Sequence, residues 1–328
     1  MSDAHGTRTP VVLDCDTGVD DACAILLAAL HPRLDLRAVT CVAGNASLAD
    51  VVRNTLTVLQ TAARPDVPVG VGARAPLLEK PFEARHVHGA DGMGDLRMPP
   101  SRLSPDPRHA VELLRDVIDA GAEEGNRVTL VPTAPQTNVA LLARTYPESF
   151  ARLGRVLFMG GGARVSNATA AAEFNVFHDP EAAAIVLDAC AEHDVPVGMY
   201  GLDVFYVPTV TRRDVARLRA VGSPVASLAS GLVEFACDRF RSEEATIGDA
   251  GAVAMLLRPE AVGTQRLPVR VELAGTWTRG RTIVDLRDWS GDMAHDPHGL
   301  AATQVDVALT VDGPALADEW LRTVGGFA

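Results

Sequence analysis

The sequence predicts an α/β protein with an open, mostly parallel, Rossmann-like sheet and helices on both faces. Short apolar runs typical of buried strands alternate with helical patterns along most of the chain, and polar residues recur just after the predicted strands end. We find no internal repeat, coiled coil, low-complexity segment or linker in the 328 residues. We therefore expect a single domain over 1–328, with residues 1–9 as a disordered tail.

The first predicted element, VVLDCDTGVDDACAILLAAL at 11–30, reads as strand, tight turn and helix. It places Asp14, Asp16, Asp20 and Asp21 at the carboxyl end of a strand, where open α/β sheets bind ligands. Four carboxylates within eight residues repel one another unless a cation lies between them, which indicates a hard-cation site. The alternative is that Asp20 and Asp21 only complement the helix N-terminus, but this leaves Asp14 and Asp16 unexplained.

The next elements continue the alternation. We expect a strand at 37–43, a helix at 48–64 with apolar residues at steps of three and four, a strand at 67–72 and a helix at 106–123. Between the last two, residues 81–104 carry Gly and Pro without a sustained period, so we predict a long loop. Loops of this length in a compact domain are usually functional.

The second half of the chain follows the same pattern. We predict strands at 127–132, 155–159, 195–200, 268–273, 281–286 and 304–311, helices at 137–145, 180–191 and 313–324, an irregular stretch at 163–180, and a mostly helical segment at 211–258 interrupted near 246–249.

Composition limits the function classes. The net charge is −12, and Lys80 is the only lysine, so nucleic-acid binding is not expected. The N-terminus lacks an apolar signal core, and the most apolar stretch, 22–30, is too short to cross a bilayer. The five cysteines are odd in number and without paired metal spacing, which is typical of buried thiols in a reducing compartment; we expect a cytoplasmic protein.

Candidate site residues lie just past predicted strand ends. Asp16, Asn45, Thr133 and the Met159-Gly160 turn occupy such positions, so a parallel sheet would bring them to one edge. The stretch 163–179 adds Asn167, Glu173, Asn175, His178 and Asp179. A site lined by Asp, Asn and Glu, with few basic side chains, suits a polyhydroxylated ligand together with Ca²⁺. Less specific interpretations are an ordinary turn for Asn45, helix caps for Thr133 and Asp179, solvated loop groups for Glu173 and Asn175, and packing for His178.

The segments DCDTGVDDACAILLAAL, VAGNASL, HGADGMG, VPTAPQTNVALL, FMGGG and NATAAAEFNVFHDPEAA, in this order, resemble the inosine–uridine nucleoside hydrolase family. The resemblance runs from about residue 10 to 205 and more weakly to the C-terminus. It implies Ca²⁺-dependent hydrolysis of the N-glycosidic bond of a ribonucleoside, giving ribose and a free base. It also suggests a homodimer or homotetramer.

The resemblance assigns roles residue by residue. Asp16, Asp21 and Asp249 would bind the ion through carboxylates and Thr133 through its backbone carbonyl, and Asp16 would take the proton of the metal-bound water. Asp14 and Asp20 would support this group. The residues that would contact the substrate are Asp20, Asn45, Met159, Asn167, Glu173, Asn175 and Asp249. The chemistry agrees, since acidic groups stabilise the positive charge that builds on the ribose as the base departs.

The sequence departs from the family pattern at Gly248, where a histidine often precedes the last metal carboxylate and contacts the leaving base. His88 in HGADGMG is our leading candidate for a residue that contacts the leaving base instead. The alternative is that His88 is a surface residue of a mobile loop. Other candidates are Arg239, Arg241, Glu243, Glu244, and stacking by Phe240 or Trp289. A third possibility is a substrate such as nicotinamide riboside, whose base leaves neutral and needs no acid.

Two competing interpretations of the function remain, together with a separate question about a second metal site. A riboside-binding scaffold without turnover fits the missing histidine, although intact Asp16, Asp21 and Asp249 argue against it. A haloacid dehalogenase-type phosphatase also begins with a strand and Asp-x-Asp, but it needs a catalytic lysine, and Lys80 lies in a Pro-flanked loop. His295 and His298 in AHDPHG suggest either a second metal site or, more often for such pairs, surface histidines.

Overall fold

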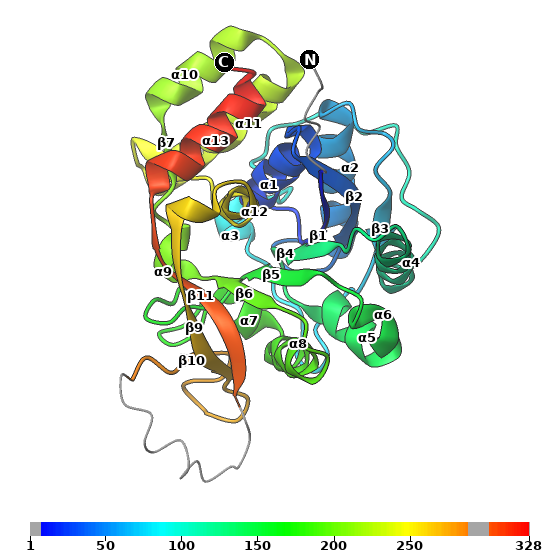
Figure 1. Cartoon of the computed structure of the whole chain (residues 1–328). Helices are drawn as coiled ribbons and strands as arrows, with labels where there is room; N and C mark the ends of the chain where they lie inside the picture. Colours follow the sequence, from blue (N-terminus) through cyan, green and yellow to red (C-terminus); the bar gives the residue numbers. More distant parts are fainter. Residues whose placement is uncertain (1–7, 288–301, 328) are drawn as a thin grey trace, which may run out of the picture.

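The computed structural model describes residues 8–287 and 302–327. A nine-stranded sheet in the order β10-β9-β11-β6-β5-β4-β1-β2-β3 runs through the molecule (Figure 1). Its strands are β1 (Thr9–Cys15), β2 (Leu34–Cys41), β3 (Val69–Val71), β4 (Thr129–Pro132), β5 (Arg155–Met159), β6 (Val197–Tyr200), β9 (Val262–Val271), β10 (Thr282–Val284) and β11 (Thr303–Val311). The strands from β11 to β3 pair in parallel, whereas β9 runs antiparallel to β11 and β10 antiparallel to β9. The predicted open, mostly parallel sheet is confirmed.

Helices cover both faces, as predicted. The core on one face is formed with α1 (Val19–Leu30), α2 (Leu48–Thr61), α11 (Pro224–Phe240), α12 (Ala250–Leu257) and α13 (Gly313–Gly325). The core on the other face is formed with α4 (Ala110–Glu123), α5 (Thr137–Thr145), α6 (Pro147–Phe150) and α8 (Pro180–Glu192). Because α1 packs against α2, α11, α12 and α13, it is buried almost all round, and this accounts for its nearly unbroken apolar sequence.

Several predicted boundaries change. The predicted loop 81–104 contains a short helix, α3 (Arg85–His88), and the irregular stretch 163–180 contains α7 (Phe174–His178). The helix predicted from residue 106 begins only at Ala110, since Pro105 and Pro107 precede it and His109 caps it. By contrast, α8 begins at Pro180 as predicted, and Asp179 is its cap: its carboxylate accepts from the Ala182 N–H at 3.0 Å.

The segment predicted as mostly helical from 211 to 258 holds three helices and a strand. The helices are α10 (Arg212–Val221), α11 and α12, and β8 (Glu244–Thr246) lies between α11 and α12 and pairs antiparallel with β7 (Thr209–Thr211). The short elements α9 (Leu202–Phe205) and η1 (Pro259–Ala261) complete the described chain. Strand β9 begins earlier than the prediction, at Val262, because the whole segment pairs with β11.

Some predictions lie outside the described residues, namely those for Trp289, His295 and His298 and most of the tail 1–9, although Thr9 already belongs to β1. The five cysteines are free and buried. Among the described residues, no helix is long and apolar enough to cross a membrane.

Candidate active site

The carboxyl ends of β1, β2, β4 and β5 meet at one edge of the sheet, and the predicted polar residues meet with them. The Thr133 N–H, just after β4, donates to the Asp14 carbonyl of β1 at 2.9 Å. The Val42 N–H, just after β2, donates to the Cys15 carbonyl at 3.0 Å. Strand pairing therefore brings the Asp-rich turn, the Gly44-Asn45 turn and Thr133 together, as the sequence predicts.

Asn45 holds two of the carboxylates side by side. Its backbone N–H donates to Asp16 Oδ2 at 2.7 Å, and its Nδ2 donates to Asp16 Oδ1 at 3.0 Å and to Asp21 Oδ2 at 3.2 Å. Asp21 also accepts from the Gly18 N–H at 2.9 Å and from Thr133 Oγ1 at 2.7 Å. Asn45 is therefore more than a turn residue: it fixes the orientation of Asp16 against Asp21.

Asp14 is fully buried and has a different set of hydrogen-bond partners from Asp16 and Asp21. One of its oxygens accepts from Thr40 Oγ1 at 2.6 Å and from Asn138 Nδ2 at 2.8 Å, and Asn138 also donates to the Cys41 carbonyl at 3.0 Å. Burial raises the pKa of Asp14 to about 7. Asn138 was missed by the sequence analysis, because an amide within a helical pattern carries no local signal of a partner 124 residues away.

Asp20, Asp21 and Asp249 each place a carboxylate oxygen within 4.8 Å of the others. Burial, and then the neighbouring carboxylates, raise the pKa of Asp21 to about 6 and that of Asp249 well above its usual range. One oxygen of Asp20 is buried and has no hydrogen-bond partner among the described residues. An all-oxygen donor set with an unsatisfied buried oxygen fits a hard cation such as Ca²⁺. Asp16 is outside this trio but is tied to it by the shared Asn45 amide.

His88 lies in α3 with 7% of its surface exposed, so the alternative of a mobile surface histidine is wrong. Its Nδ1 accepts from the Val19 N–H at 3.2 Å, which leaves the proton of the neutral ring on Nε2. Asp20 Oδ1 lies 3.7 Å from Nδ1, but burial lowers the pKa of His88 to about 4, so this contact is not an ion pair at neutral pH. A Cβ on Gly18 would lie 2.6 Å from this Nδ1, so the turn requires glycine there.

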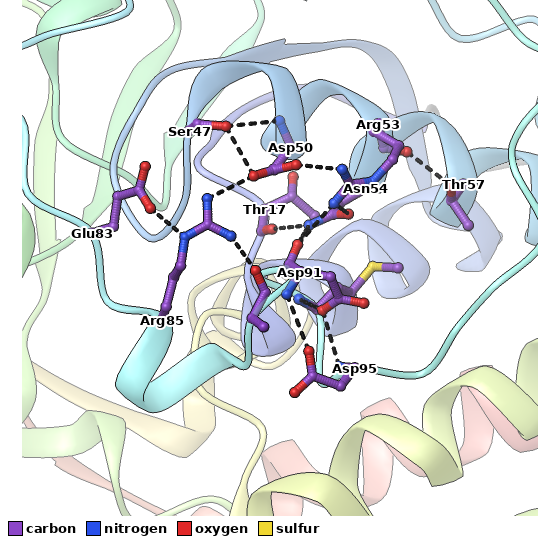
Figure 2. Close-up of polar contacts among 12 residues, drawn as sticks. Thr17, Ser47, Asp50, Arg53, Asn54, Thr57, Glu83, Arg85, Asp91 and Asp95 are labelled. Carbon is purple, nitrogen blue, oxygen red and sulfur yellow. Dashed lines mark hydrogen bonds and ion pairs between the residues drawn. The ribbon is translucent and has the colours of Figure 1, made fainter.

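The segment that carries His88 is anchored to α2 (Figure 2). Arg85 donates to Asp50 Oδ2 at 2.7 Å and to the Ala90 carbonyl. Asn54 Nδ2 donates to the carbonyls of Thr17 at 3.2 Å and Asp91 at 3.1 Å. One buried amide therefore joins the turn between β1 and α1 to the HGADGMG segment.

That segment is also held within itself. The Asp91 carboxylate accepts from the Met93 N–H at 2.7 Å and the Asp95 N–H at 3.0 Å, and the Asp91 N–H donates to Asp95 at 3.1 Å (Figure 2). Gly92 has φ +77°, a conformation that favours glycine. The predicted functional loop is thus an ordered structure in this region.

The residues predicted between 159 and 175 form a second polar group. The Glu173 carboxylate caps α7 and accepts from the N–H groups of Asn175 at 2.8 Å and Gly161 at 2.8 Å. Asn175 Nδ2 donates to the carbonyls of Thr133 at 3.0 Å and Met159 at 3.3 Å. Both side chains are buried, so the interpretation as solvated loop groups is wrong.

These two groups face a cavity of about 650 Å³. The predicted site residues that line it are Asp20, Asn45, His88, Thr133, Met159, Asn167, Glu173, Asn175 and Asp249. Asp16 and Asp21 do not line it; both have no exposed surface and lie beneath it. The cavity is also lined by aromatic residues that the sequence did not indicate, namely Phe82, Phe174, Phe177, Phe205, Tyr206 and Phe235. Most of them come from loops and short helices, where no periodic signal marks them, whereas Phe235 lies in the long helix α11.

The cavity lining distinguishes between the residues that could replace the histidine absent at position 248. Gly248 has φ +54°, and a Cβ there would lie 2.5 Å from Asp20 Cβ, so the backbone leaves no room for a side chain. Of the candidates within the described residues, His88 and Phe240 line the cavity. The remaining ones, Arg239, Arg241, Glu243 and Glu244, are not part of its lining. His178 is also outside the lining; it packs against Phe82 and Phe174, with ring centroids 4.9 and 5.7 Å away.

Comparison with known proteins agrees with this site. The family model described as inosine-uridine preferring nucleoside hydrolase matches residues 11–318. The chain is 41% identical to the pyrimidine-specific ribonucleoside hydrolase RihA of Enterobacter sp. (strain 638), over 86% of this chain and 90% of that protein. It is 38% identical to RihA of Salmonella agona (strain SL483), over 92% and 96%. The solved structure of a purine-preferring ribonucleoside hydrolase from Gardnerella vaginalis superposes with a TM-score of 0.86 at 28% identity, covering 97% of this chain and 99% of that one. The chain therefore belongs to the inosine-uridine preferring nucleoside hydrolase family and is a nucleoside hydrolase.

Proposed function

We propose that this enzyme hydrolyses the N-glycosidic bond of ribonucleosides, pyrimidine ribonucleosides first, and releases ribose and the free base with Ca²⁺ as cofactor. The observation that carries the proposal is the cavity lining, which combines acidic and amide groups from the carboxyl edge of the sheet with several aromatic rings. The polar part suits a sugar, and the aromatic part suits a flat heterocycle.

The residues present fit a Ca²⁺ ion. The carboxylates of Asp16, Asp21 and Asp249 and the backbone carbonyl of Thr133 would hold it. When bound, such an ion fixes sugar hydroxyls and water and favours the negative charge that develops on the attacking oxygen. Thr133 also accepts from Asn175 Nδ2, but a carbonyl oxygen has two lone pairs and one remains.

Asp16 is the residue that we propose as general base. Both of its oxygens are fixed by Asn45, and the side chain has no exposed surface, so its orientation toward the attacking water is set before substrate binds. The water oxygen forms the new bond to the anomeric carbon, and Asp16 takes the proton.

The remaining lining groups would bind the ribose. Asp20, Asn45 and Asp249 belong to the carboxylate group, and Met159, Asn167, Glu173 and Asn175 belong to the second polar group. The carboxylates among them would also stabilise the positive charge that builds on the ribose ring as the bond to the base breaks.

His88 is the residue that we propose as a hydrogen-bond donor to the base. It is neutral at physiological pH, its Nδ1 is occupied by the Val19 N–H, and its Nε2–H is left to face a ligand. The preference for pyrimidines is supported by the RihA relatives, which are named pyrimidine-specific at 38% and 41% identity.

The test is release of ribose and base from uridine, cytidine, inosine, adenosine, guanosine and nicotinamide riboside. We expect turnover of uridine and cytidine to exceed that of the purines. Turnover of nicotinamide riboside alone would instead indicate a leaving group that needs no donor. Tight binding of nucleosides without release of ribose from any of them would favour the binding scaffold, which the glycine at 248 makes the second candidate.

A further inference from the structure

A departing base needs a hydrogen-bond donor, and most side-chain donors in the cavity wall are already in use. Asn45 donates to Asp16 and Asp21, and Thr133 donates to Asp21. Asn175 Nδ2 donates to two backbone carbonyls, and Thr246 Oγ1 donates to the Phe205 carbonyl at 2.6 Å. Gly248 has no side chain to offer.

Tyr206 is different, because its hydroxyl is an acceptor in its one side-chain hydrogen bond among the described residues. Asn167 Nδ2 donates to this hydroxyl at 3.4 Å. A phenol that accepts through its oxygen keeps its own hydrogen for another partner. The Tyr206 side chain lines the cavity, as do its neighbours Phe205, Asn167 and Phe174.

The position of Tyr206 is also well defined. It directly follows α9, which begins two residues after β6 ends, so it belongs to the same carboxyl edge of the sheet as the other site residues. Its ring packs edge-on against Phe205 with centroids 5.0 Å apart, and the Phe205 carbonyl is held by Thr246. Tyr206 is 47% exposed, and the partial burial of its phenol raises the pKa, so Tyr206 stays protonated at neutral pH.

We infer that Tyr206 is a further catalytic residue, whose hydroxyl donates a hydrogen bond to the departing base from the aromatic side of the cavity. The inference rests on the proposed function. When the bond between the anomeric carbon and the base nitrogen breaks, its electron pair stays on the base, and the Tyr206 O–H stabilises that charge without giving up its proton. Solvent water supplies the proton that the free base finally carries. Tyr206, just after α9, would then be a second donor to the base beside His88, which comes from α3.

The test compares Tyr206→Phe with the wild-type enzyme on two leaving groups. Uridine and inosine release a base that needs a donor, whereas p-nitrophenyl β-D-ribofuranoside releases an anion that its nitro group already stabilises. Removing one preorganised donor lowers kcat by roughly 10²–10³ in known enzymes. We expect Tyr206→Phe to lower kcat for the nucleosides at least about tenfold and to leave kcat for the nitrophenyl riboside within about twofold.

The matched control is Tyr146→Phe, which removes a phenol hydroxyl outside the cavity, where the ring stacks with Arg115 at 4.9 Å. This control should leave kcat unchanged for both the nucleosides and the nitrophenyl riboside. If Tyr206→Phe lowers kcat equally for both kinds of substrate, the residue contacts the ribose or supports the fold. If kcat is unchanged for both, the hydroxyl does not contact the base. Each of these results overturns the inference. Wild-type turnover of the nucleosides tests the proposed function separately, and the ratio between the two substrates tests Tyr206.

Discussion

Replacing Asn54 with alanine should weaken both the fold and the reaction, although Asn54 lies outside the cavity lining. Its side chain is 2% exposed, and its Nδ2 joins the Thr17 carbonyl to the Asp91 carbonyl (Figure 2). The substitution removes both bonds and also the one that Arg53 Nη2 donates to Asn54 Oδ1 at 3.2 Å, whose donor is exposed to water. Asp91 keeps a second donor, Arg53 Nη2 at 2.9 Å, but no other donor to the Thr17 carbonyl is found within residues 8–287 and 302–327.

The magnitude follows from these contacts. A typical hydrogen bond contributes a net ~1 kcal/mol to stability, and a buried carbonyl left without a partner costs about 1–3 kcal/mol. One bond lost at Asp91 and one orphaned carbonyl at Thr17 together predict about 2–4 kcal/mol of lost unfolding free energy. The effect on activity comes through His88, because Asn54 holds the 85–95 segment against the turn whose Val19 N–H donates to His88 Nδ1.

Urea unfolding and kcat for uridine are the two measurements. Gln60→Ala is the matched control, because Gln60 also lies on α2 and accepts from the Arg102 N–H at 2.6 Å, at the far end of the same long connection. We expect a loss of at most about 1 kcal/mol and unchanged kcat for that control, because the exposed Arg102 N–H can bond to water instead. In a double-mutant cycle, Asn54→Ala should lower kcat in the wild type and have little further effect on it once His88 is alanine. If Asn54→Ala unfolds at the wild-type urea concentration, or lowers kcat equally in both backgrounds, the reasoning is refuted.

Three further predictions follow from the geometry of the site. Gly44→Ala should lower kcat about a hundredfold or more with a smaller change in KM, because a Cβ there would lie 2.0 Å from Asp16 Oδ2 and must displace that carboxylate; unchanged kcat would contradict the role of Asp16. Gly248→His should lower activity rather than restore a family-like donor, since φ is +54° and the Cβ would lie 2.5 Å from Asp20 Cβ. A gain in kcat for inosine would contradict this steric argument. The metal-free protein should lose unfolding free energy as pH rises from 3.8 to about 7. Burial raises the folded-state pKa of Asp14 from 3.8 to about 7 and that of Asp21 to about 6, so in this range the folded protein keeps protons that the unfolded chain has released, and this stabilisation is gone once pH passes the folded-state pKa. Saturating Ca²⁺ should reduce this loss in thermal unfolding scans, because the ion would bind the ionised carboxylate of Asp21, and an identical pH dependence with and without the ion would contradict a cation at the site.

The fold was largely predictable because its strands are buried on both faces. β1, β4 and β5 therefore read as short apolar runs, and the polar residues that follow them mark the binding edge of the sheet. The short helices α3 and α7 were not predictable in the same way. Each has only four or five residues and is held by tertiary contacts, such as those of Arg85 with Asp50 and of Glu173 with Gly161.

The residues of the candidate site likewise differ in how far the sequence could predict them. Asp16, Asn45 and Thr133 are close to strand ends, so their convergence follows from parallel pairing. Asn138 and Tyr206 could not be found from local patterns, because their roles depend on partners 124 and 39 residues away. The steric reason for glycine at 248 likewise appears only once Asp20 is seen packed against it.

The most direct test of the account is a Ca²⁺ titration of ribose release from uridine by enzyme first stripped of metal with a chelator. We expect no release from the stripped enzyme and full recovery as Ca²⁺ saturates the site. Asp249→Asn should need a higher Ca²⁺ concentration for any recovery, because it removes one of the proposed carboxylate ligands, whose oxygen lies within 4.8 Å of oxygens of Asp20 and Asp21. Full release of ribose by enzyme shown by elemental analysis to contain no metal would contradict the central claim.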